Sequence, residues 1–254
     1  QNSVISIMAL PNNSAIALSG TGVYRVDQRY IQGTTWSWRK IIDGNFIYMW
    51  NLSCKNIDAS PLDSNKVFIL KDYFNLVLYN VANGLYVYLP LPPPPRLGGN
   101  TPYIARGPFI RVSRSSKSVS SVELWVGQGY YLLNLTISYD ELERLSNLEK
   151  PLLTVDWWTQ ITTLRVPQGI HDDTGYLALD NNKRPLLYGC DGGLFLPPGN
   201  DRANWTGIAT GRRGTNSLQI TDCAGTNVSP TSGENRTSLY FATQDNNVWA
   251  SPDN

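Results

Sequence analysis

The amino-acid sequence predicts an all-β fold of many short strands, on three observations: its composition, its aromatic content and a repeated hairpin. Glycine (21) and proline (16) are frequent among the 254 residues, which suits strands joined by many turns. Phe, Trp and Tyr together make up 11% of the chain. Charged residues make up only 16% and nearly cancel, leaving +1, so no surface for nucleic acid or for an acidic membrane is indicated.

The repeated hairpin occurs five times along the chain. Each copy has an apolar strand, a turn rich in Gly, Asp or Asn, and a second strand with an aromatic residue. Turns of this composition tolerate the positive φ angles that tight hairpins need. The five copies are residues 16–26, 67–81, 123–135, 186–196 and 238–251.

The spacing of the copies predicts a β-propeller. Successive turns lie roughly 50 to 60 residues apart, near the upper range for a four-stranded blade. The strands are apolar runs, as expected where each sheet lies between two neighbours. We therefore expect residues 1–254 to form a single, partial propeller domain of about four to five four-stranded blades. The remaining blades would come from the rest of the chain or from another subunit.

Two segments depart from the strand pattern. Residues 138–150 place leucines at helical intervals, and either Ser138 or Asp140 is suited to cap the N-terminus of a helix. We expect one short helix here, inserted between blades. Residues 88–100 are rich in proline and end in a pair of glycines, which predicts a stiff loop that crosses the propeller surface.

One stretch resembles a known family. Residues 177–195, LALDNNKRPLLYGCDGGLF, are similar to the blade signature of secreted propellers with BNR, or Asp-box, repeats, as in sialidases, xyloglucanases and sortilin-like receptors. The following NWTGI (204–208) resembles the end of such a box, and residues 217–254 resemble the next blade. A looser copy spans residues 20–38, and the resemblance is weak over residues 40–165. It implies blades with Asp-box hairpins, whose Asp fixes the turn and catalyses nothing.

Two classes of function remain open for such a fold. The first is a non-catalytic secreted module, in which the propeller recognises a glycan or a protein, or serves a structural role. The second is a glycoside hydrolase of the Asp-box propeller type that uses paired carboxylates. We favour the first, because each carboxylate has a structural explanation and glutamate is scarce. No nucleotide fingerprint or catalytic triad is present in the sequence, and we expect no cofactor and no metal.

For a hydrolase, the candidate catalytic residues are Asp191, Asp245, His171 and Asp173. Asp191 and Asp245 occupy equivalent hairpins of adjacent blades, although Asp also suits such turns for conformational reasons. His171 is the only histidine and stands in an HDD stretch, which is otherwise a polar connecting loop. Arg165, in LRVP, resembles the sialidase arginine that binds the carboxylate of the substrate.

Aromatic side chains are the candidates for contact with a sugar ring. Such a ring packs on a flat apolar surface flanked by hydrogen-bonding groups. The alternative is that the same side chains pack between blades. The four candidates are Trp157, Trp158, Trp249 and Tyr130.

Several features favour a secreted, extracellular glycoprotein. The chain begins QNSVISIMAL, without an initiator methionine, so either a signal peptide has been removed or this is a segment of a longer chain. No apolar run approaches the length of a membrane span. Cys190 and Cys223 lie in the same C-terminal region and are candidates for one disulfide, leaving Cys54 free; three buried thiols are the alternative. Six sequons for N-glycosylation begin at Asn12, Asn51, Asn134, Asn204, Asn227 and Asn235.

Overall fold

The structure is a computed structural model in which most of the strands of the chain are described. The described residues are 4–11, 13–27, 31–32, 35–44, 46, 56–72, 75–91, 109–116, 118–128, 131–149, 162–164, 174–190, 193–197, 205–209, 220–228, 236–243 and 248–251.

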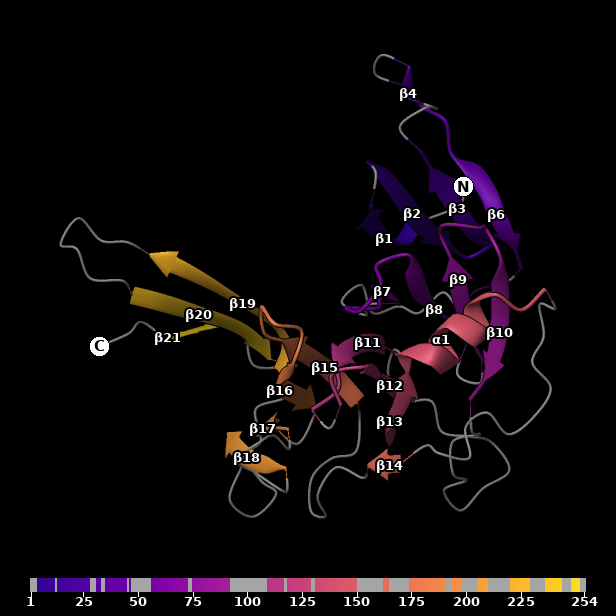
Figure 1. The fold of residues 1–254 in the computed structure, drawn as a ribbon. Coiled ribbons are helices and arrows are strands. Elements are labelled where there is room, and N and C mark those ends of the chain that lie inside the picture. The colour runs from indigo at the N-terminus through magenta and orange to yellow at the C-terminus, as the bar shows by residue number, and fades with distance from the viewer. Residues whose placement is uncertain are drawn as a thin grey trace, which may run out of the picture.

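These residues form four antiparallel sheets of four strands, one of three strands and one small hairpin (Figure 1). The first sheet contains β1 (Val4–Leu10), β2 (Ser14–Ser19), β3 (Gly22–Val26) and β6 (Arg39–Asp43), with the hairpin β4 (Ile31–Gln32) and β5 (Thr35–Trp36) before β6. The second contains β7 (Ile57–Ala59), β8 (Lys66–Asp72), β9 (Asn75–Asn80) and β10 (Tyr86–Pro90). The third contains β11 (Phe109–Arg114), β12 (Ser121–Gln128), β13 (Tyr131–Ser138) and β14 (Thr162–Leu164). The fourth contains β15 (Thr174–Leu179), β16 (Pro185–Cys190), β17 (Gly193–Leu196) and β18 (Thr206–Ala209), and the fifth β19 (Ile220–Val228), β20 (Arg236–Thr243) and β21 (Val248–Ser251).

The predicted repeat marks the same part of every sheet. Its five copies coincide with the hairpins β2–β3, β8–β9, β12–β13, β16–β17 and β20–β21, which are the second and third strands of each sheet. The repeat thus located the second and third sheets in residues 40–165, where the resemblance to Asp-box propellers was weak. The expected all-β propeller of four to five blades is confirmed.

The sheets stack face to face, in the manner of propeller blades. The first strands β1, β7, β11 and β15 contact one another in succession, so they line the inner side of the row. In β8, Val67 and Ile69 pack with the first sheet, whereas Phe68 and Leu70 pack with the third. All four side chains are at most 4% exposed, because successive residues of a strand point to opposite faces and both faces are covered.

An aromatic cluster joins the third and fourth sheets. Phe109 and Trp125 of the third sheet pack in one apolar cluster with Tyr188 and Phe195 of the fourth. Trp205, from the stretch that resembles the end of an Asp-box, meets both sheets. Its ring lies edge-on to Trp125 at 6.1 Å and to Tyr188 at 5.5 Å. Edge-to-face pairs at these separations are favourable beyond the area that they bury.

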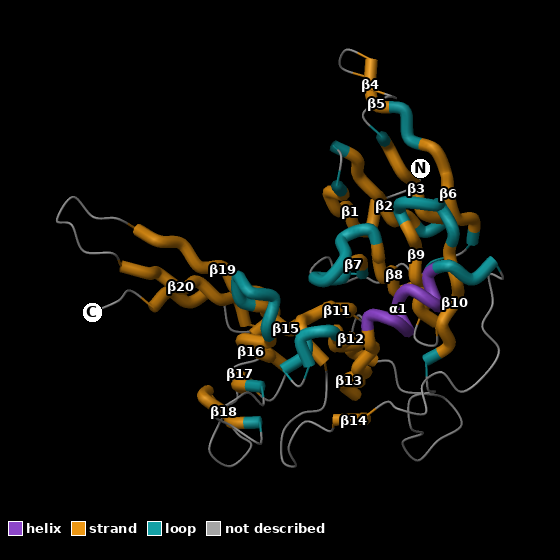
Figure 2. Tube along the Cα trace, in the orientation of Figure 1, coloured by secondary structure: helices purple, strands orange, loops and turns teal. Residues whose placement is uncertain are grey.

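The predicted helix is α1 (Tyr139–Ser146), and Ser138 is its N-cap residue, with Oγ accepting from the Glu141 N–H at 3.2 Å. The expectation that the helix is inserted between two blades along the chain is corrected, because α1 connects β13 to β14, which are two strands of the third sheet. Its buried Leu142 and Leu145 close the core between the second and third sheets. Figure 2 shows α1 beside β10. Among the described residues no helix is long and apolar enough to cross a membrane.

The proline-rich segment is corrected at its start. Residues 88–90 are not loop but belong to β10, which among the described strands is an edge strand of the second sheet and pairs with β9. Proline is tolerated in such an edge strand because no second neighbour needs its missing N–H. Residues 92–100 lie outside the described part of the chain.

Candidate functional site

Most of the residues predicted for chemistry lie outside the described part of the chain, and their roles stay predictions. Trp249 lies in β21, although the position of its side chain is not described. Cys190 ends β16 and Cys223 lies within β19, so the disulfide also stays a prediction. The residues outside the described part are Asp191, Asp245, His171, Asp173, Trp157, Trp158, Tyr130 and Arg165.

Of the six predicted glycosylation sites, Asn134 has a described side chain. It lies in β13 directly opposite Trp125 of β12, and so shares the face of the sheet that packs on the fourth sheet. Its Nδ2 atom is buried and has no hydrogen-bond partner in the described structure. The nitrogen that would carry a glycan is therefore buried in the described structure, and the glycosylation of Asn134 stays a prediction. Asn227 lies in β19, and the other four sequons begin outside the described residues.

The inner strands of three successive sheets bring together Asp58, Arg111 and Tyr176, which we call the inner-strand cluster. Asp58 lies in β7, Arg111 in β11 and Tyr176 in β15. The Arg111 Nε atom is 3.6 Å from Asp58 Oδ2, and its Nη1 donates to the Tyr176 hydroxyl at 3.1 Å. The cluster was not predicted from the sequence. Its signal is a charged residue inside each of two apolar first strands, in NIDAS and FIRVSR.

Asp58 joins the second sheet to the third. Its Oδ2 accepts from the Val112 backbone N–H at 2.9 Å, and its Oδ1 accepts from Ala59 N–H at 3.2 Å. Asp58 and Arg111 are 8% and 7% exposed, so each compensates a charge that would be costly to bury alone. This carboxylate is therefore occupied by structural contacts.

Tyr176 is the member of the cluster that reaches solvent. It is 40% exposed, and its ring packs at a tilt against Phe109, with centroids 6.2 Å apart. Because Arg111 donates to the Tyr176 oxygen, the hydroxyl hydrogen of Tyr176 is available to donate to a group outside the cluster. An aromatic face beside a directed hydroxyl donor suits a sugar ring or a polar protein surface.

Glu123 is a buried carboxylate outside the inner-strand cluster and is 5% exposed. Its Oε1 accepts from Ser115 Oγ at 3.1 Å and from the Ser116 N–H at 3.3 Å, which holds the turn after β11. Within the described part of the chain, no group of three or more His, Cys, Asp or Glu residues is placed to hold a metal.

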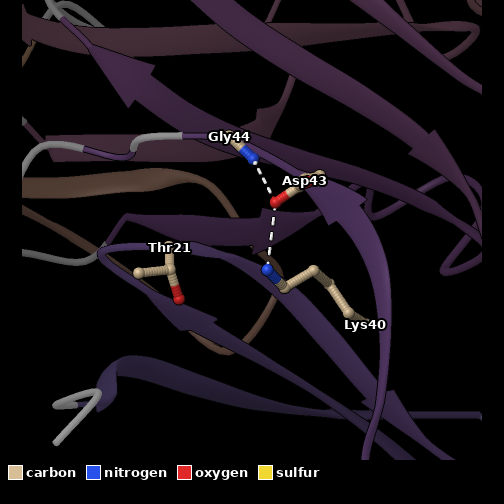
Figure 3. Close-up of a pocket in the computed structure, with 4 residues that line it drawn as sticks. All are labelled: Thr21, Lys40, Asp43 and Gly44. Atoms are coloured by element: carbon tan, nitrogen blue, oxygen red, sulfur yellow. Dashed lines mark hydrogen bonds and ion pairs between the residues drawn. The ribbon is translucent and has the colours of Figure 1, made fainter.

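A shallow hollow of about 370 Å³ lies at the outer edge of the first sheet, lined by Thr21, Lys40, Asp43 and Gly44 (Figure 3). Lys40 Nζ lies 3.0 Å from Asp43 Oδ1, and this contact raises the pKa of the Lys40 ammonium and lowers the pKa of the Asp43 carboxyl. The Thr21 hydroxyl lies 3.2 Å from the Tyr24 hydroxyl, and this hydrogen bond lowers the pKa of Tyr24.

Comparison with known proteins places the chain by its fold. No protein-family model matches it, and neither does any curated protein. Among solved structures, the extracellular domain of a protein described as a hybrid two component system, from B. thetaiotaomicron, matches with a TM-score of 0.51 and 12% identity over 99% of this chain. An ancestral GH74 enzyme matches with a TM-score of 0.48 and 16% identity over 98% of this chain, and the Swd1 β-propeller domain from Myceliophteria thermophila with 0.49 and 11% over 99%.

The chain spans only part of these structures: 28% of the two component domain, 31% of the GH74 enzyme and 72% of the Swd1 domain. At such identities the likeness concerns the fold alone. The stacked four-stranded sheets identify the class of protein: this chain is an incomplete β-propeller.

Proposed function

We propose that this chain is part of an extracellular β-propeller that acts as a non-catalytic recognition module, and that Tyr176 of the inner-strand cluster contacts a glycan or protein ligand. The observation that carries the proposal is the exposure of Tyr176, 40%, beside a buried Arg111 that fixes its hydroxyl. A binding group held by a rigid neighbour loses little conformational freedom when the ligand arrives.

The position of the cluster also supports binding. Propeller sheets are joined along their inner strands, and β7, β11 and β15 each supply one residue. A ligand at Tyr176 would therefore contact a surface that is held by three sheets at once. Extracellular location is supported by the sequons and by the extracellular domain among the solved neighbours.

The described carboxylates favour binding over hydrolysis. A glycosidase needs two carboxyl groups about 5 Å apart, or about 6.5 to 9.5 Å apart, that both face the substrate. Asp58 and Glu123 are instead engaged with backbone N–H groups, a hydroxyl and a guanidinium. A hydrolase is thus the competing outcome of the test below, with Asp191 and Asp245 as its predicted carboxylates.

The test is a panel of immobilised polysaccharides, probed with the intact protein and with two tyrosine variants. Tyr176→Ala is expected to weaken retention on the bound glycan about ten- to thirty-fold, as removal of a central aromatic contact does. Tyr139→Ala is the matched control, because Tyr139 lies on α1 and is 38% exposed. We expect that variant to bind like the wild type.

A third variant separates the ring from the hydroxyl. Tyr176→Phe keeps the aromatic surface, so it is expected to retain part of the affinity that Tyr176→Ala loses. Equal binding by all three variants would exclude Tyr176 from the ligand site. Release of sugar from the same polysaccharides or from aryl glycosides, lost in Asp191→Asn with folding intact, would establish the hydrolase instead.

A further inference from the structure

The connection between β9 and β10 contains Asn83 followed by Gly84, which is the only Asn-Gly pair in the sequence. Both residues are exposed. Gly84 has a φ angle of +78°, a conformation that favours glycine. An asparagine before a glycine is prone to deamidation, because glycine has no side chain to hinder attack by its own backbone nitrogen.

Deamidation of this pair needs water and no other reactant. The Gly84 backbone nitrogen attacks the Asn83 Cγ atom, and the new nitrogen–carbon bond closes a succinimide ring. The bond between Cγ and Nδ2 breaks, and the amide nitrogen of Asn83 leaves as ammonia with the proton of the Gly84 N–H. Water then opens the ring at either carbonyl carbon, which leaves aspartate or isoaspartate at position 83.

In the folded chain, hydrogen bonds hold the groups that would react. The Gly84 N–H donates to the Asn80 carbonyl at 2.8 Å. Asn83 Oδ1 accepts from the Leu85 N–H at 2.9 Å, and Asn83 Nδ2 donates to Asn147 Oδ1 at 2.8 Å. The reaction requires the Gly84 nitrogen to give up its proton and the Asn83 amide nitrogen to leave, so the bonds that these two groups make oppose it.

The acceptor of the Asn83 amide belongs to α1. Asn147 is the C-cap residue of this helix, and its Oδ1 also accepts from Asn80 Nδ2 at 3.4 Å. Asn80 Nδ2 donates in addition to the Ser146 carbonyl at 3.3 Å, and Asn80 is 2% exposed. These bonds fasten the C-terminal end of α1, which connects two strands of the third sheet, to the second sheet.

Backbone groups fix the orientation of the two facing amides. The Leu85 N–H bonds to the oxygen of Asn83, and the Asn147 nitrogen donates to the Glu143 carbonyl at 2.9 Å. The Asn147 oxygen therefore faces Asn83. An aspartate at position 83 has no amide donor, so it would place a carboxylate against this oxygen. Two facing acceptors repel, and the carboxylate would also lie near the negative end of the α1 dipole.

We propose that Asn83 is a site of deamidation that the docked helix α1 protects, and that its conversion to aspartate or isoaspartate weakens the docking of α1 on the second sheet. The inference does not depend on the ligand of Tyr176. The buried Leu142 and Leu145 of α1 belong to the core between the second and third sheets. Modification of one exposed turn thus loosens the contact between two sheets.

The first experiment compares the rate of deamidation in the folded protein with the rate in the same protein unfolded in guanidinium chloride. Peptide mapping by chromatography and mass spectrometry separates the asparagine, aspartate and isoaspartate forms of the peptide that contains residue 83. Because the reaction requires local opening, the folded protein is expected to react at least about tenfold more slowly. Rates within about twofold of each other, or no reaction in the unfolded chain, overturn the proposal.

A substitution at the end of α1 tests whether the helix provides the protection. Asn147→Ala removes the acceptor of the Asn83 amide, so the rate in the folded protein is expected to rise about three- to tenfold. Asn182→Ala is the matched control, because Asn182 is an exposed asparagine in the turn between β15 and β16, and it is expected to leave the rate unchanged. Equal rates in the two variants overturn the proposal.

A second pair of variants measures the effect of the product without requiring the reaction. Asn83→Asp places the carboxylate opposite Asn147, whereas Ala82→Asp places the same charge on the neighbouring exposed residue. Hydrogen exchange of the α1 amides reports how often the helix opens. Relative to the wild type, exchange in α1 is expected to be about three- to tenfold faster in Asn83→Asp and to change less than about twofold in Ala82→Asp. Equal exchange in the two variants overturns the proposal.

Discussion

The second and third sheets are covered on both faces, whereas the first is covered on one. The burial of side chains along β8 and β1 shows this difference. In β8 the first five residues are all buried, from Lys66 to Leu70. In β1 the exposed positions are Val4, Ile7 and Ala9, and in the described strand only Leu10 is buried. A strand between two sheets becomes a continuous apolar run, but a strand with one free face keeps an alternation of burial.

The comparison teaches where stability resides. Side chains from both faces of the second sheet join two separate apolar clusters, so this sheet holds its neighbours on either side. The first sheet contributes to one cluster only. Substitutions on its outward face, which is the side of the sheet that carries Val4 and Ile7, are therefore expected to cost little stability, whereas those in the second sheet test the fold.

The largest expected effect comes from matched isoleucines. Ile69→Ala in β8 removes a side chain that is 0% exposed, and it is expected to lower the free energy of unfolding by about 2–5 kcal/mol. Ile7→Ala removes the same atoms from a side chain that is 62% exposed, and the loss is expected to stay under about 0.5 kcal/mol in the 254-residue chain. Urea unfolding monitored by tryptophan fluorescence measures both. Equal losses would show that the outward face is already packed.

Ion pairs provide a second contrast of similar size. Asp58→Ala leaves Arg111 buried without its carboxylate, and it is expected to cost about 3–5 kcal/mol. Asp43→Ala breaks the exposed pair with Lys40 at the outer edge of the first sheet, and no measurable change in the denaturation midpoint is expected.

A double variant sharpens the ion-pair prediction. Arg111→Met in the Asp58→Ala background removes the unpaired charge, so it is expected to restore most of the lost stability. A double-mutant cycle in urea gives the coupling energy. Additive losses in that cycle would mean that Asp58 acts through its other contacts, such as those with the Val112 and Ala59 N–H groups, and not through Arg111.

The smallest expected effect on stability is in α1, which packs on the core between the second and third sheets. The hydrogen bond from Arg144 lowers the pKa of Glu141 below its ordinary value. A carboxyl with a lowered pKa in the folded state stabilises the fold above its unfolded pKa, and this contribution is lost as the pH falls through the folded pKa. Glu141→Gln is therefore expected to cost about 0.3–0.5 kcal/mol at neutral pH, since the pair is largely exposed, and nothing once the pH lies below the folded-state pKa.

The control for that prediction is Asp140→Asn in the same first turn. Asp140 shares the favourable position near the helix N-terminus, but Arg144 bonds to Glu141. A pH profile of the unfolding temperature that is identical for both variants would assign the effect to the helix dipole. A loss for Glu141→Gln that persists at low pH would contradict the ion-pair account.

The architecture was predictable from local patterns. The turn chemistry of residues 16–26 and 123–135 located the central hairpin of their sheets, and the leucines of residues 138–150 located α1. The position of α1 within the third sheet was not predictable, because it depends on β14, a strand of three residues (Thr162–Leu164) with no apolar pattern of its own. Residues 88–90 were misassigned because proline indicates a loop unless the strand is known to be at an edge.

The candidate site was less predictable than the fold. Asp58, Arg111 and Tyr176 lie on three sheets and are 53 and 65 residues apart along the chain, so no local motif joins them. They meet because the first strands of successive sheets are neighbours. The sequon at Asn134 illustrates the same limit, because whether its amide is buried depends on the fourth sheet, beyond any three-residue signal.

The most direct test of the central claim compares the retention of the wild type, Tyr176→Ala and Tyr139→Ala on immobilised polysaccharides. The account predicts that Tyr176→Ala is retained about ten- to thirty-fold more weakly, whereas Tyr139→Ala binds like the wild type. Equal retention of all three proteins would contradict it.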